Sequence, residues 1–160
     1  MIQRKQTIFL ALALFSFVFL FAFPFASLKL GTTVTCQISI LGIENFDLFT
    51  EFLPKFNYMF IVMQILATLF MSLVGIAIFT YKRRPLQIRL CAFALFINAL
   101  MIGAMFFTVT MITKAVSLEA GAVSYLWMTY LPMVTLLPIR TAIRAIRKDE
   151  AMVRSLNRLR

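Results

Sequence analysis

The sequence predicts an all-α membrane protein with four transmembrane helices, a small strand-containing periplasmic loop and a basic amphipathic helix at the cytoplasmic C-terminus. Hydrophobic residues make up 62% of the 160 positions and the mean hydropathy is +0.93, whereas soluble domains contain about 45–50% apolar residues. Four apolar stretches are each long enough for a bilayer, and the basic residues lie between and after them. Composition, span length and charge placement therefore agree on this fold class.

The apolar stretches set the expected boundaries. A hydrocarbon core of about 30 Å needs about 20 helical residues, so spans are expected at about 7–28, 58–81, 88–113 and 120–139. No acidic residue interrupts them, and Arg89 lies in the first turns of the third helix, where its side chain can reach the headgroups. We expect the first span to be retained and not cleaved as a signal peptide, because its apolar run is long and lacks a small-x-small site. Residues 1–139 then form the transmembrane domain.

The basic residues predict the orientation. Thirteen of the 16 Lys and Arg residues flank one end of the predicted spans, and only Lys29, Lys55 and Lys114 lie on the other side. Cytoplasmic loops of membrane proteins carry this excess of positive charge. Both termini are therefore expected in the cytoplasm and the protein in the bacterial inner membrane, as a multi-pass protein.

The periplasmic loop, residues 29–57, is expected to contain a strand. β-Branched residues dominate between Thr32 and Leu41, and Gly31 and Gly42 bracket the run, which is typical of one half of a β-hairpin. Phenylalanines then recur at near-helical spacing before Pro54. We expect an amphipathic turn there that covers the end of the bundle; a docking surface for a periplasmic partner is the alternative.

Small and polar residues on the second and third helices predict helix packing. Side chains of this kind let backbones approach and form hydrogen bonds between helices. The candidates are Gln64, Thr68, Ser72 and Gly75 on the second helix and Asn98, Ala99 and Gly103 on the third. A transport pathway would use similar residues, but usually with an ionisable group near the midplane, and the sequence has none there.

The last segment, residues 140–160, predicts a basic amphipathic helix. Apolar residues such as Ile143 and Ile146 recur on one face, and arginines lie mostly on the other. Such a helix can lie on an anionic leaflet or dock on a partner. The candidate contacts for a partner or an anionic lipid are Lys82, Arg83, Arg84, Arg89, Arg140, Arg144, Arg147, Lys148, Arg154 and Arg158. Glu150 stands four residues before Arg154, the favourable order for a helical ion pair, and the acidic pair Asp149 and Glu150 is interpreted as helix salt bridging, in preference to a metal or acid–base site.

Three segments resemble a known family: residues 1–7 (MIQRKQT), 81–91 (YKRRPLQIRLC) and 146–160 (IRKDEAMVRSLNRLR). They are similar to an uncharacterised family of Bacteroidota membrane proteins catalogued as domain of unknown function 4293. The resemblance covers essentially the whole chain, and its tail is the most specific part. It implies a four-span protein of the bacterial inner membrane and carries over no catalytic residue.

The chemistry-bearing residues favour a function without catalysis. The chain has no histidine, its spans hold no acidic residue, and Cys36 and Cys91 are predicted in different compartments without a disulfide. We expect no enzyme activity, metal, cofactor or small-molecule substrate. The expected function is a structural or accessory subunit of a membrane complex whose arginine-rich face contacts a protein, an anionic lipid or ribosomal RNA at a protein-export site; other nucleic-acid contact is not expected. A small transporter or lipid-handling protein is the alternative.

Overall fold

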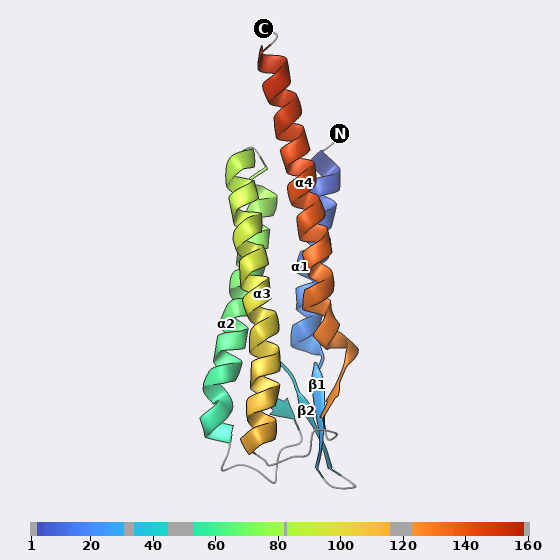
Figure 1. Cartoon of the computed structure of the whole chain (residues 1–160), viewed down its shortest axis with the longest axis vertical. Coiled ribbons are helices and arrows are strands. Elements are labelled where there is room, and N and C mark those ends of the chain that lie inside the picture. Colours follow the sequence, from blue (N-terminus) through green and yellow to red (C-terminus); the bar gives the residue numbers. More distant parts are fainter. Residues whose placement is uncertain (1–2, 31–33, 45–52, 82, 116–122, 159–160) are drawn as a thin grey trace.

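Four helices form an antiparallel bundle with a small sheet at one end, in a computed structural model that describes residues 3–30, 34–44, 53–81, 83–115 and 123–158 (Figure 1). The helices are α1 (Gln3–Ala22), α2 (Leu53–Phe79), α3 (Arg84–Ala115) and α4 (Leu131–Arg158). The start of α1, the junction of α2 with α3 and the end of α4 lie together, opposite the sheet (Figure 1). The chain therefore traverses the length of the bundle four times.

Apolar residues fill the space between the helices. The most extensive contacts join α2 to α3 and α1 to α4, and the two pairs meet where Phe17 stacks on Phe70, with ring centroids 3.9 Å apart. The outer faces are apolar as well: Ile8 and Phe15 on α1 and Phe96 on α3 are all at least 60% exposed. Helices that are apolar on every side are typical of membrane spans or of the core of a large protein.

The sheet has four antiparallel strands in the order β3-β2-β1-β4. The strands are β1 (Ala26–Leu30), β2 (Val34–Ile38), β3 (Ile43–Glu44) and β4 (Val123–Tyr125). Strand β2 lies inside the segment where the sequence predicts a strand, and its Cys36 and Ile38 are buried. Gly42 turns the chain from β2 to β3 at a φ of 156°, which favours glycine, and its carbonyl accepts a hydrogen bond from the Ser39 N–H. The phenylalanine-rich turn predicted before Pro54 lies outside the described residues.

Two of the predicted helical spans are too long. Helix α1 ends at Ala22, just before Pro24, and 26–30 form β1 because their backbone groups pair with β2 and β4. The fourth predicted span begins with strand β4 and a 3₁₀-helix, η2 (Trp127–Tyr130), and becomes α-helical only at Leu131. Within the described residues, α2 and α3 are the two helices that are long and apolar enough to cross a membrane by length and composition.

Helix α4 continues beyond the predicted end of the fourth span. It passes through Pro138 without interruption and reaches Arg158, although proline lacks the N–H that would bond one turn back. Burial continues across residue 139, where the apolar stretch gives way to the basic amphipathic segment: Ile139, Ala142 and Ile146 are all completely buried. Packing of this face against α1 holds the helix together. The boundary predicted at residue 139 falls inside a single helix.

Candidate functional site

The end of the bundle opposite the sheet carries most of the predicted contact residues. Pro85 lies in the first turn of α3, where its missing N–H costs nothing. The turn before it closes through a hydrogen bond from the Arg83 N–H to the Thr80 carbonyl, 3.0 Å long. The buried Gln87 side chain donates to the Ala77 carbonyl at 3.0 Å and joins α3 to α2. This end is therefore a fixed platform for the charged side chains.

A buried polar contact joins α1, α3 and α4 at this end. The Gln6 amide Nε2 donates to the Asp149 carboxylate oxygen Oδ2, and both residues are less than 10% exposed. The Arg84 guanidinium donates to the backbone carbonyl of Asp149 at 3.3 Å. Burial of a carboxylate needs such partners because desolvation of an unpaired charge is costly. Asp149 therefore fixes the second half of α4 to the bundle.

Helix salt bridging does not describe the contact of Asp149, whose carboxylate is buried and accepts a hydrogen bond from Gln6 of another helix. Asp149 follows Ala142 and Ile146 at seven and three positions, on the buried face of α4, so its carboxylate meets α1 instead of solvent. Glu150 is half-buried, and the side chain of its predicted partner Arg154 lies outside the description. The helical spacing of Asp149 from Ala142 and Ile146 could have indicated its burial.

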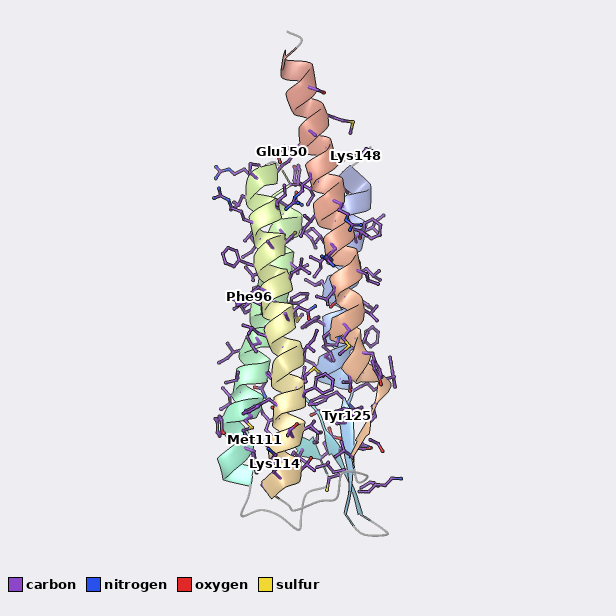
Figure 2. The ribbon with its side chains drawn as sticks, in the orientation of Figure 1. Phe96, Met111, Lys114, Tyr125, Lys148 and Glu150 are labelled. Atoms are coloured by element: carbon purple, nitrogen blue, oxygen red, sulfur yellow. The ribbon has the colours of Figure 1, made fainter. Side chains whose placement is uncertain are left out.

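Apart from Arg84, the described basic side chains at this end are exposed. Arg83, Arg89, Arg140, Arg144, Arg147 and Lys148 are exposed, and Arg84 is half-buried. Lys148 lies at the opposite end of the molecule from Lys114 (Figure 2). The end of α4 projects past the other helices (Figure 1), while the side chains of Lys82, Arg154 and Arg158 lie outside the description. The described bases cover the outer surface of one end of the bundle, where they can bind anions.

The two amide side chains among the packing candidates bind different elements. Asn98 is completely buried, and its Nδ2 donates to the Pro132 carbonyl and to Thr135 Oγ1, both at 2.9 Å, joining α3 to α4. Its Oδ1 has no hydrogen-bond partner among the described residues. Gln64 donates from Nε2 to the Ile40 carbonyl at 3.2 Å, joining α2 to the chain after β2. The amides therefore hold two separate junctions.

The remaining packing candidates lie away from the centre of the bundle. Thr68 and Ser72 are exposed and donate to carbonyls of their own helix, Gln64 and Thr68 respectively, both at 2.8 Å. They line a shallow open groove on α2. Ala99 and Gly103 are exposed on α3, and Gly75 is half-buried. Met63, Phe70 and Val74 are completely buried on the inner face of α2, whereas the hydroxyl residues Thr68 and Ser72 are exposed.

The described residues contain no group of three or more histidine, cysteine or acidic side chains placed to hold a metal ion. Cys36 and Cys91 are buried and form no disulfide. Burial raises the pKa of the Cys36 thiol, because the thiolate is less well solvated there. A buried thiol with a raised pKa is a poor nucleophile near neutral pH.

A family model matches residues 2–159, almost the whole chain. The chain belongs to the family described as domain of unknown function DUF4293. The resemblance inferred from the two ends and the central turn is thereby confirmed. No curated protein and no solved structure matches the chain. For this DUF4293 protein, function has to be inferred from the arrangement of its own residues.

Proposed function

We propose that this DUF4293 protein is a non-catalytic, multi-pass protein of the bacterial inner membrane that serves as a structural or accessory subunit of a larger complex. In this proposal the chain crosses the bilayer four times with both termini in the cytoplasm. The basic end of the bundle contacts the partner. The proposal rests on the apolar outer surface, the separation of charge along the bundle and the projecting helix α4.

Membrane insertion is supported by the outer surface. Helices α2 and α3 have the length and composition of spans, and α1 contributes a shorter apolar helix over Gln6–Ala22. On the fourth crossing, η2 and the first turns of α4 expose Trp127, Tyr130 and Leu137, each more than 50%. Lipid is the solvent that such a surface requires, because in water it would promote aggregation.

The observation that carries the proposed role is the two-sided construction of α4. Its apolar face, from Ile139 to Asp149, is packed against the bundle. Its exposed face carries Arg140, Arg144 and Arg147. A helix that already buries its apolar face in its own fold has little left to insert into a leaflet. It presents instead a fixed row of guanidinium groups that suits an anionic surface.

The partner chemistry that fits this row is a cluster of carboxylates or phosphates. An acidic protein of the same membrane would supply carboxylates. Anionic lipid headgroups, or ribosomal RNA at a protein-export site, would supply phosphates. The alternative function, a small transporter or lipid-handling protein, would need polar groups that line a common cavity. The unpartnered Oδ1 of Asn98 favours this alternative, but the hydroxyls of Thr68 and Ser72 line a separate open groove on α2, and Gln64 bonds to the Ile40 carbonyl.

Affinity capture from membranes in mild detergent, with and without prior crosslinking, tests the proposal. The wild-type protein should retain a partner. A variant with R144E, R147E and K148E should lose it, because all three side chains are exposed and their charge is reversed. Lys114→Glu, an exposed charge at the opposite end, is the matched control and should retain the partner. Recovery of the wild-type protein alone under both conditions would contradict the proposal.

A further inference from the structure

The bundle has two sides, one formed by α2 and α3 and the other by α1 and α4, and the apolar length of the two sides differs. Heights along the bundle can be compared from a hydrogen bond that joins one side to the other. The Asn98–Thr135 contact places these residues of α3 and α4 at the same height. Toward the basic end, Arg89 on α3 and Arg144 on α4 each lie about 14 Å from that level, at about 1.5 Å per residue, and both are exposed. Arg144 is therefore level with Arg89, and the exposed Arg140, the first base on α4, lies about 6 Å nearer the sheet at about 1.5 Å per residue.

Toward the sheet, the two sides end at different heights. Helix α3 continues to the exposed Lys114, about 24 Å from the Asn98 level at about 1.5 Å per residue. On the other side, the first turn of α4 and η2 advance only about 14 Å to Trp127, at about 1.5 and 2 Å per residue. The ring contact of Tyr125 with Phe106, 5.4 Å between centroids, supports this difference in height. Strand β4 is level with Phe106, which lies about two turns before Lys114 on α3. The difference is about 10 Å.

Strand β4 needs water on its open side. It is the edge of the described sheet and pairs only with β1. In the antiparallel register, Ser124 faces Ser27 and Leu126 donates its N–H to Phe25, so the backbone groups of Val123 and Tyr125 point to the open edge. No described strand pairs with that edge. Hydrocarbon does not tolerate an open strand edge, so the edge that the described strands leave open favours an apolar layer that ends near Trp127 on this side.

The opposite side needs lipid at the same height and beyond it. Phe107 on α3 and Tyr58, Ile61 and Val62 on α2 are between 46% and 59% exposed. Phe107, Tyr58 and Val62 border a groove with almost no polar surface between the two helices. Water or headgroups alone would leave this apolar patch poorly covered.

Resting on the proposed membrane insertion, we propose that the outer boundary of the hydrocarbon layer is stepped across this protein. Lipid acyl chains cover α2 and α3 almost to Lys114, whereas phospholipid headgroups and water reach Trp127 and the edge of β4 on the α1–α4 side. On that side only about 20 Å of backbone separate Trp127 from the exposed Arg140, at about 1.5 to 2 Å per residue, against a usual core of about 30 Å. The α1–α4 face thus meets a thinner bilayer.

Trp127 is the single tryptophan of the chain and is 64% exposed, so it reports depth without labelling. The full-length protein is reconstituted in phosphatidylcholine–phosphatidylglycerol vesicles whose acyl chains carry bromine at one chosen depth. We expect Trp127 to be quenched most by shallow bromines and to be accessible to acrylamide. In the double variant W127F/F107W, the tryptophan on α3 should be quenched most by deep bromines and be several-fold less accessible to acrylamide. W127F/Y58W supplies a second probe on α2 if the first variant folds poorly.

Each result decides the matter. Different depths for positions 127 and 107 support the step, and equal depths, whether shallow or deep, overturn it while leaving membrane insertion intact. Full acrylamide access at both positions, with no quenching by bromines at any depth, would overturn membrane insertion itself. Failure of the step and failure of the proposed function therefore give different readings.

Discussion

Gln6 of α1 and Asp149 of α4, 143 positions apart, meet in a buried hydrogen bond at the basic end of the bundle. Gln6 lies in the first turns of α1 and Asp149 in the second half of α4, a helix whose end projects past the other helices (Figure 1). The contact thus sets the length of α4 that belongs to the bundle. It ties the second half of α4 to the first turns of α1.

Asp149→Ala should therefore loosen the second half of α4. The substitution leaves the buried Gln6 amide unsatisfied, which costs about 1–3 kcal/mol. Unfolding in mixed micelles should show this loss, and amide exchange should increase between residues 142 and 150. Asp149→Asn keeps an acceptor oxygen and should lose less. If Gln6→Ala and Asp149→Ala had fully additive effects, the two side chains would not be coupled.

Phe17 and Phe15 offer a matched pair on α1. Phe17 is completely buried and stacked on Phe70, whereas Phe15 is 61% exposed. Phe17→Ala should leave a cavity between the helix pairs and cost about 3 kcal/mol, the lower end of the range for a buried phenylalanine. Phe15→Ala should change the free energy of unfolding by less than about 0.5 kcal/mol. Detergent-induced unfolding measures both variants. Equal losses of stability would contradict the finding that α1 buries Phe17 and exposes Phe15.

Asn98→Ala should weaken the contact between α3 and α4. Hydrogen bonds between membrane helices contribute about 0.6–2 kcal/mol, and Asn98 makes two that join these helices. Thr135→Val removes the side-chain acceptor and should cost less, because the Pro132 carbonyl remains available to Asn98. The same unfolding measurement ranks the two variants. An Asn98→Ala protein as stable as the wild type would argue against this junction.

Single cysteines at Arg83 and Lys114 should be labelled from opposite sides of the membrane. Both positions are exposed and lie at opposite ends of the bundle. Background reaction at Cys36 should be slow at neutral pH: burial raises its thiol pKa, so its thiolate, the reactive form, accumulates only at a higher pH than for an ordinary cysteine. If both sites were labelled from one side of sealed vesicles, α3 would not cross the membrane between them.

Local patterns in the sequence account for much of the bundle. Apolar runs longer than a bilayer predict α2 and α3, and the β-branched segment around Cys36 predicts β2. Pro85 lies in the first turn of α3, a position that proline favours. These elements are predictable because length, periodicity and proline position act within a few residues of one another. The family membership also follows from the sequence.

Pairing between distant segments decides the rest. Ala26 faces Tyr125 across the sheet, and either segment alone reads as the end of an apolar helix. The exposed positions of Thr68, Ser72 and Gly103 depend on which face of each helix the larger side chains fill. Asn98 finds its partners on α4, which no local spacing indicates.

The sequence by itself determined an apolar chain with two long spans, a strand between the first two helices and positive charge gathered near its termini and the central turn, because these properties are sums over neighbouring residues. Only the tertiary structure decided that residues 26–30 and 123–125 form strands, that Asp149 is buried and that the two sides of the bundle differ in apolar length. Those outcomes depend on which groups meet from distant parts of the chain, since a backbone or side-chain polar group is stable in an apolar interior only where a partner reaches it.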